Sequence, residues 1–334
     1  MQGLELSRRY FAECVMPALQ ATVPQCRPHT AAGLIGGSQA YGNDDEVSRD
    51  HAWGGVVMLW LPGDARARWG AEVEAVCAAA PREFLGYPAF CTAPDLDALL
   101  EQAVGCREAP TALLDWLRIP EQYVFEVAYA PVFRDPTGEV TRRFEGFANC
   151  PEEVWLYRIG VHLFWLAEWG LKSLRRAERR GDAITAALSW ARFAVQAMRV
   201  GFALSRRHAP YHKWLWREFG KLPAPCDEVA GLLQTGFASG SEYGATVDSV
   251  VTAYLAELER RGFEPRPIAP EDRQRMAYPA TAEVVSYCQA IAAELAARGA
   301  PEQMAHVASA VVLPPPYEGI TPGVPFKVAP HDGW

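Results

Sequence analysis

The segment from Gly33 to Trp53, GLIGGSQAYGNDDEVSRDHAW, combines glycines, a serine and carboxylates at a spacing that suits phosphate and metal chemistry. We expect a strand to run into Gly36, Gly37 and Ser38, and a second strand to begin near Asp50. Glycines after a strand let the backbone approach a phosphate, and a serine hydroxyl and the next amides can hydrogen-bond it. An acidic residue at the entry to the following strand can hold Mg²⁺. The segment therefore predicts a triphosphate site between a donor-rich loop and a metal ion.

Two common phosphate-binding patterns, GxxxxGK[ST] and GxGxxG, are absent from this segment. The segment instead resembles the polymerase-beta-like nucleotidyltransferase superfamily, which has a Gly-Ser element followed about a dozen residues later by Asp-x-Asp; here Ser38 and Asp50 are 12 apart. The phrase DDE-x-SRDH-x-W looks like an uncharacterised bacterial branch of that superfamily. HAPYHKW (208–214) is similar to the Ala-Pro-Tyr-x-Lys-Trp element of the same branch, so the resemblance spans roughly residues 30 to 220.

The chain departs from the superfamily at one metal-binding position. It has Asp50-His51-Ala52 where the family has Asp-x-Asp, and positions 50 and 52 of a strand point to the same face. Two carboxylates there would share two metal ions, and Ala52 cannot coordinate either. Either the aspartate was deliberately replaced by Ala52 to trap a substrate complex, or a natural lineage has lost the ligand. The survival of the other motif residues favours the first explanation.

The superfamily also implies a third carboxylate on a later strand, and Glu126 is the best candidate. It lies within YVFEVAYAPVF (123–133), which we expect to form a strand, and it is surrounded in sequence by apolar residues. A buried, unpaired carboxylate is costly, so such a residue often has a function. The alternative is an exposed position on an amphipathic strand. The resemblance thus assigns catalysis to positions Asp50, Ala52 and Glu126, and metal binding to Asp50 and Glu126.

Three consecutive acids, Asp44, Asp45 and Glu46, precede Asp50. They are candidates for binding the amine of an acceptor or a metal-bound water, and the alternative is a solvated turn. We expect the next two residues, Ser48 and Arg49, to fix the turn that presents Asp50.

Basic residues of the second half are candidates for binding the nucleotide together with Gly37 and Ser38. Lys213 is one of only four lysines among 32 basic residues, and an ammonium near a triphosphate would stabilise the leaving pyrophosphate. Tyr211 could stack or pack, whereas Trp214 is expected in the core. Arg176 and Arg180, one helical turn apart, could add phosphate contacts, although a solvated basic face is the slightly better explanation.

The hydrophobic pattern places these residues in two regions of different character. Before residue 150, expected strands at 31–36, 53–61 and 123–133 alternate with expected helices at 4–19, 64–80 and 95–104. After residue 150 the expected elements are helices, at 152–180, 183–207, from Pro210, 242–262 and 280–298. The expected fold class is α+β, with a nucleotidyltransferase-type mixed sheet and flanking helices (1–150), a mostly helical domain (151–300) and a Pro/Gly-rich tail (301–334).

Composition fits a folded protein: of 334 residues, 50% are hydrophobic and 22% charged, which excludes a disordered or fibrous chain. Residues 1–150 hold 12 basic and 20 acidic residues, whereas residues 158–221 hold 13 basic and four acidic ones. The overall charge of −8 argues against bulk binding of nucleic acid, without excluding it. The N-terminus has no signal-peptide layout, no apolar run is long enough for a membrane span, and the eight cysteines form no CxxC pair. We therefore expect a cytoplasmic protein with reduced thiols.

The resemblance implies transfer of a nucleoside monophosphate from a nucleoside triphosphate, with ATP the expected nucleotide, to a hydroxyl or amine acceptor. It implies Mg²⁺ or Mn²⁺ as cofactor, and a small molecule is the expected acceptor. Because Ala52 stands where the superfamily has a metal-binding aspartate, we expect the transfer activity of this chain to be impaired. Two alternatives stay open: a non-catalytic nucleotide-binding or regulatory protein of the same fold, and a purely structural helical scaffold.

Overall fold

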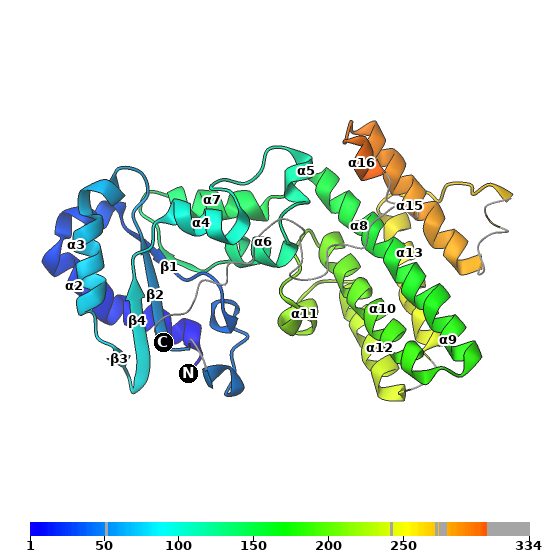
Figure 1. Ribbon diagram of the computed structural model, residues 1–334, viewed down its shortest axis with the longest axis horizontal. Coiled ribbons are helices and arrows are strands. Elements are labelled where there is room, and N and C mark those ends of the chain that lie inside the picture. Colours follow the sequence, from blue (N-terminus) through cyan, green and yellow to red (C-terminus); the bar gives the residue numbers. More distant parts are fainter. Residues whose placement is uncertain (51–52, 241–242, 271–272, 274–278, 306–334) are drawn as a thin grey trace. The chain divides into compact units, whose positions relative to one another are not determined.

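The computed structural model describes residues 1–305 except 51–52, 241–242, 271–272 and 274–278. These residues divide into two compact units. The first unit contains Met1–Thr111 and Ile119–Asn149, and the second contains Ala112–Arg118 and residues 150–305. The fold class is α+β, as the sequence predicts: a mixed sheet lies in the first unit, and the second unit is helical in its described part (Figure 1).

The sheet of the first unit has the strand order β3-β4-β2-β1-β5. The central strand β2 pairs antiparallel with β1 and parallel with β4, while β5 and β3 are antiparallel to their neighbours. The strands are β1 (Ala31–Gly33), β2 (Gly55–Trp60), β3 (Glu83–Phe84), β4 (Tyr87–Thr92) and β5 (Val132–Arg134).

Helices cover both faces of this sheet (Figure 1). Val57 and Leu59 of β2 are fully buried in a core formed with the N-terminal helices and α3. Trp60, which lies next to Leu59 and is also fully buried, meets the ring of Phe144 on α7. The alternation along β2 therefore separates two hydrophobic layers. The helices are α1 (Gly3–Tyr10), η1 (Phe11–Val15), α2 (Met16–Thr22), η2 (Pro24–His29), η3 (Ser38–Tyr41), η4 (Val47–Asp50), α3 (Ala65–Ala79), α4 (Leu96–Val104), α6 (Glu121–Ala128) and α7 (Glu139–Ala148).

The second unit is built around an antiparallel pair of long helical segments. Residues 152–180 form one uninterrupted helical segment, which Gly181 ends in a left-handed conformation (φ 68°). Asp182 then caps the next helix by accepting a hydrogen bond from the Thr185 amide at 3.0 Å. The helices are α5 (Leu113–Trp116), α8 (Glu152–Leu166), η5 (Ala167–Leu174), α9 (Arg175–Arg180), α10 (Ala183–Leu204), α11 (His212–Phe219), α12 (Cys226–Ser239), α13 (Gly244–Arg260), α15 (Pro279–Ala297) and α16 (Glu302–Ala305).

Most expected elements are confirmed, but the expected strand over 123–133 is wrong. Residues 121–128 form α6, and only Val132–Arg134 are a strand. The run is apolar apart from Glu126 and has no clear period of two, so its pattern does not distinguish a strand from a buried helix. Pro120 fits the position before the first helical turn, and Glu121 follows as an acid near the helix N-terminus. At the chain end, residues 302–305 are helical, and residues 306–334 lie outside the described part.

No helix in the described part of the chain combines the length and hydropathy needed to cross a membrane.

Gly54, the residue before β2, is at a position that only glycine can occupy without strain. Its φ is 152°, and a Cβ there would lie 2.2 Å from the carbonyl oxygen of Pro88. We expect Gly54→Ala to lower the free energy of unfolding by about 2–4 kcal/mol, measured by urea denaturation. Gly63→Ala is the matched control, because Gly63 also has a positive φ (60°) but nothing within 4 Å, and we expect a loss of about 1 kcal/mol. Equal losses in the two variants would contradict this assignment.

Candidate functional site

The glycine–serine segment forms an open loop after β1. Gly36 and Gly37 both have a positive φ (77° and 79°), and Gly37 precedes the first residue of η3, Ser38. A Cβ on Gly37 would meet nothing within 4 Å, so the backbone faces open space at this residue. Gly42 ends η3 in a left-handed conformation. The expected order of strand, glycine turn and short helix is therefore confirmed, and the loop leaves room for a group to approach its backbone.

Glu126 lies beside this loop, although about 90 residues separate them in sequence. Its Oε2 is 3.7 Å from the position of a Cβ on Gly36. The Tyr41 hydroxyl donates a hydrogen bond to the backbone oxygen of Glu126 at 3.4 Å, and the Tyr41 ring lies 4.9 Å from that of Phe125. The fold thus brings Glu126 to the Gly-Ser loop from α6, rather than from the expected strand.

The Glu126 carboxylate is held in an environment that disfavours its charge. Burial raises its pKa from an ordinary value near 4.5 to about 6. Within the described part of the first unit, no cationic side chain forms an ion pair with it. A half-buried carboxylate of this kind, next to a loop with open backbone, is suited to accept a cation or a proton.

The carboxylate of Asp50 and the residues His51 and Ala52 lie outside the described part, so their assigned roles stay predictions. The backbone of Asp50 is the last residue of η4, and β2 begins at Gly55. The expectation that the strand begins near Asp50 is therefore wrong. Its physical reason is local: Asp45 Oδ1 accepts hydrogen bonds from both the amide and the hydroxyl of Ser48 at 3.0 Å, which folds this stretch into a turn. Ser48 does fix the turn, as expected.

The three consecutive acids have different surroundings. Asp44 Oδ2 accepts hydrogen bonds from the Gly3 amide at 2.7 Å and from Trp53 Nε1 at 2.9 Å, which joins the start of α1 to a residue two positions before β2. Asp45 holds η4 through Ser48, and Glu46 is exposed. Two of the three carboxylates thus make internal hydrogen bonds, and a role of these acids in acceptor binding stays a prediction.

Two residues support the segment around the glycines: Gln39, which no sequence pattern marked, and Trp53, the last residue of the phrase DDE-x-SRDH-x-W. Gln39 is 3% exposed and makes hydrogen bonds to Ser7 and to both backbone groups of Gly54. Trp53 contacts Asp44, and the Arg49 guanidinium lies 4.7 Å from the centre of its ring. A signal for Gln39 was its place next to Ser38, but its partners are distant in sequence and no local pattern marks them.

In the second unit, α11 presents cations around an aromatic ring. Lys213 Nζ and the Arg217 guanidinium lie 4.9 Å and 5.5 Å from the centre of the Trp214 ring. Tyr211 and Lys213 are exposed, and Trp214 is half-buried rather than in the core as expected. Contact of Tyr211 or Lys213 with a nucleotide stays a prediction.

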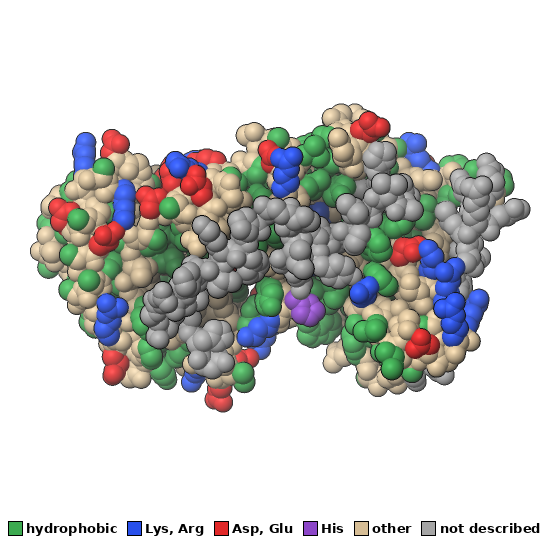
Figure 2. All heavy atoms as spheres, viewed as in Figure 1, with side chains coloured by type: hydrophobic (Ala, Val, Ile, Leu, Met, Phe, Trp, Pro, Cys, Tyr) green, Lys and Arg blue, Asp and Glu red, His purple; other side chains and the backbone are tan. Residues whose placement is uncertain are grey.

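Arg176 and Arg180 lie far from Lys213 within the same unit. They are exposed on α9, which precedes α10, whereas α11 follows it. The 22 residues of α10 span about 33 Å, and Figure 1 shows α9 and α11 at its opposite ends. Figure 2 shows Lys and Arg side chains gathered over the region of α9. These two arginines therefore belong to a basic surface separate from the one on α11, and one small ligand cannot contact both.

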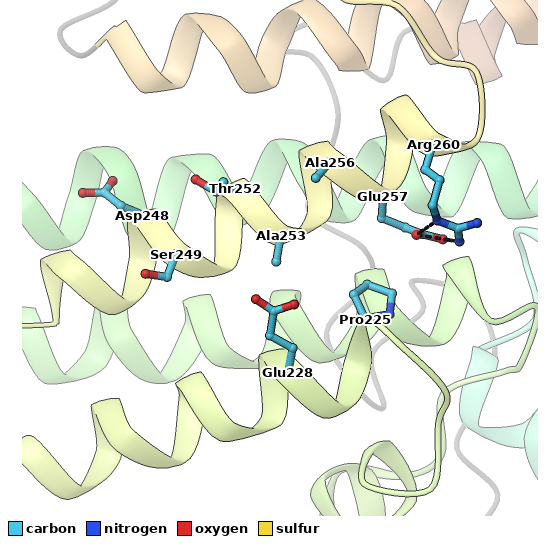
Figure 3. Close-up of a pocket in the computed structure, with 9 residues that line it drawn as sticks. All are labelled: Pro225, Glu228, Asp248, Ser249, Thr252, Ala253, Ala256, Glu257 and Arg260. Atoms are coloured by element: carbon cyan, nitrogen blue, oxygen red, sulfur yellow. Dashed lines mark hydrogen bonds and ion pairs between the residues drawn. The ribbon is translucent and has the colours of Figure 1, made fainter.

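A groove of about 590 Å³ lies between α12 and α13 of the second unit (Figure 3). None of the residues predicted from the sequence lines it. Glu257 at one end is held by Arg260 and Arg261, and small side chains form part of its floor. The lining residues are Pro225, Glu228, Asp248, Ser249, Thr252, Ala253, Ala256, Glu257 and Arg260. Among the described side chains, which do not include that of Asp50, no three His, Cys, Asp or Glu residues gather as a ready metal site.

Comparison with known proteins gives two similarities. A family model described as a domain of unknown function (DUF4037) matches residues 116–215, a stretch that contains both Glu126 and Lys213. A solved structure of a nucleotidyltransferase-like protein from Exiguobacterium sibiricum 255-15 is similar at 12% identity and a TM-score of 0.35. This similarity covers 85% of the present chain and 92% of the other. No curated protein matches the chain.

Proposed function

We propose that the first unit carries a metal-dependent nucleotidyltransferase site. It would move a nucleoside monophosphate from a nucleoside triphosphate, with ATP the first nucleotide to test, to the hydroxyl or amine of a small acceptor. The observation that carries the proposal is the position of Glu126 beside Gly36, which joins a carboxylate to a loop suited to phosphate. The motif resemblance between residues 30 and 220 supports the same function.

The loop would hold the phosphates through its backbone. Positive φ angles at Gly36 and Gly37 turn the chain sharply, and the amides that follow at the start of η3 are donors without a helical partner. The Ser38 hydroxyl, half-buried at the same place, adds a donor. Gly37 and Ser38 are therefore the proposed phosphate-binding residues of this unit.

Glu126, together with Asp50, would hold Mg²⁺ or Mn²⁺. The fit rests on the chemistry of Glu126: a desolvated carboxylate without a described cationic partner gains most from a bound cation, and hard divalent cations prefer carboxylate oxygens. When bound, the metal supplies positive charge to the phosphoryl group under attack. The acceptor oxygen or nitrogen bonds to the α-phosphorus as the bond to pyrophosphate breaks, and the proton of the acceptor passes to solvent water.

Ala52 gives weight to a second function, a non-catalytic nucleotide-binding or regulatory protein. Both functions require nucleotide binding, whereas a structural scaffold does not. We expect ATP with Mg²⁺, at about 100 times its dissociation constant, to stabilise the chain by about 2.7 kcal/mol. Thermal unfolding with ATP and Mg²⁺, with Mg²⁺ alone and with ribose 5-phosphate measures this stabilisation. The absence of any shift specific to ATP would contradict both nucleotide-based functions.

A further inference from the structure

The side chain of Gln39 connects the Gly-Ser loop to the start of β2 and to α1. Its Oε1 accepts a hydrogen bond from the Gly54 amide at 3.2 Å, and its Nε2 donates to the Gly54 carbonyl oxygen at 3.4 Å. Nε2 also donates to Ser7 Oγ at 3.2 Å. A carboxamide offers a donor and an acceptor side by side, which is what the two backbone groups of Gly54 require.

Ser7, on α1, takes part in the same group of hydrogen bonds as Gln39 and Gly54. Its hydroxyl oxygen accepts a hydrogen bond from the Val56 amide at 3.0 Å and donates to the Gly54 carbonyl at 3.3 Å. Ser7 is fully buried and Gln39 is 3% exposed, so water does not compete for these hydrogen bonds. Buried networks in which each member is satisfied hold their members in one arrangement.

The packing at this point leaves little freedom for movement. A Cβ on Gly3 would lie 2.8 Å from Gln39 Cβ and 2.8 Å from Trp53 Nε1, so the start of α1 touches both residues. Asp44 accepts hydrogen bonds from that same Gly3 amide and from Trp53. Asp44 and Trp53, which flank the segment that carries Asp50, therefore both contact the start of α1.

The short helix η3 also reaches Glu126. Gln39 faces Gly54 and Ser7, while Tyr41 on the same helix donates to the backbone oxygen of Glu126. The glycines of the Gly-Ser loop immediately precede this helix, and Ser38 is its first residue. The position of η3 thus sets where the loop lies relative to Glu126 and to β2.

We infer that Gln39 is a positioning residue, which fixes the Gly-Ser loop relative to the carboxylates through its hydrogen bonds with Gly54 and Ser7. The inference rests on the proposed function, and Gln39 itself need not touch the nucleotide. A displacement of about 1 Å at a reacting centre can cost about 100-fold in rate. Loss of these hydrogen bonds is therefore expected to lower kcat rather than metal affinity.

The test uses the full chain with Ala52→Asp as the parent. Gln39→Met keeps the length of the side chain and removes its hydrogen bonds, and we expect kcat per folded molecule to fall by about 100-fold. The dissociation constant for Mn²⁺, measured by electron paramagnetic resonance, should stay unchanged. Gln196→Met is the matched control, since Gln196 belongs to the second unit, where its Oε1 lies 2.8 Å from His162 Nδ1. It should lower the unfolding temperature and leave kcat unchanged.

Gln39→Glu is a second variant for the case that Gln39→Met does not fold, because it keeps the shape and the acceptor for the Gly54 amide. It should also lower kcat, since an ionised carboxylate cannot donate to Gly54 or Ser7. A kcat equal to that of an active parent in a folded Gln39 variant would overturn the inference. An inactive parent would instead overturn the proposed function, and the inference with it.

Discussion

Ala52→Asp is expected to raise metal-dependent nucleotidyl transfer by about 100- to 1000-fold, the range that one charge-stabilising group contributes in other enzymes. The physical reason is that a second carboxylate near Asp50 would complete the ligands for the metal ions implied by the motif. The measurement is release of pyrophosphate from labelled nucleoside triphosphates, with Mg²⁺ and a pool of amine- and hydroxyl-bearing acceptors.

Ala52→Asn is the matched control for this experiment, because it adds similar volume without the charge, and it should give a much smaller gain. Tight nucleotide binding by the chain and by Ala52→Asp, with turnover by neither, would favour the non-catalytic alternative. A gain that is equal for Asn and Asp would contradict a role in metal binding.

Glu126→Gln is expected to have opposite effects on stability and on activity. The native pKa of about 6 lies above the ordinary value of 4.5, so the folded chain holds the proton of Glu126 more tightly than the unfolded chain. Protonated Glu126 therefore adds to the free energy of unfolding, and this contribution is fully present below pH 4.5 and is lost as pH rises through 6. At pH 8 the buried charge of Glu126 therefore lowers the free energy of unfolding by up to about 2 kcal/mol. Glu126→Gln removes the charge and should raise the free energy of unfolding by a similar amount.

Urea denaturation at pH 8 and at pH 4.5 measures this effect, and the gain in the free energy of unfolding from Glu126→Gln should shrink at the lower pH.

The same substitution should reduce metal-dependent turnover by at least about 100-fold when it is made in the Ala52→Asp chain. In the chain that keeps Glu126, metal affinity should fall as pH decreases through about 6, because protonated Glu126 is a poor metal ligand. Destabilisation by Glu126→Gln at pH 8 would contradict the burial argument.

Much of the fold follows from local patterns in the sequence. The short apolar run VVMLW, followed by the turn residues Pro62 and Gly63, predicts β2, and the amphipathic run from Glu152 to Arg180 predicts the long helical segment of the second unit. Asp95 caps α4 as expected, accepting a hydrogen bond from the Ala98 amide at 2.9 Å. These elements are predictable because their apolar spacing and their end signals agree.

Other elements were not predictable, because the tertiary structure decides them. The run YVFEVA is apolar except for Glu126 and shows no clear period, and in the first unit it forms part of α6, which buries Val124, Phe125 and Val127. The strand β4 contains Pro88, which weakens a strand assignment from sequence. Whether these two segments form a helix or a strand depends on how their side chains are buried and which elements they pack against, and the sequence does not show either.

The candidate site was predictable by residue type but only partly by position. Gly37 and Ser38 were predicted from their chemistry and Glu126 from the resemblance, and the structure brings Glu126 to the loop from a helix rather than a strand. Gln39 was missed because its partners, Ser7 and Gly54, are 32 and 15 residues away. A motif identifies the groups that could react, whereas the supporting hydrogen bonds depend on the fold.

The central claim is that Glu126 and the Gly-Ser loop form one site for a metal ion and a nucleotide. Its most direct test is the titration of the chain with Mn²⁺, with and without ATP, followed by electron paramagnetic resonance. We predict that the chain binds Mn²⁺ more tightly with ATP present, and that Glu126→Gln weakens this binding while the chain stays folded. Equal Mn²⁺ binding by the two forms, at pH 8 and in the presence of ATP, would contradict the claim.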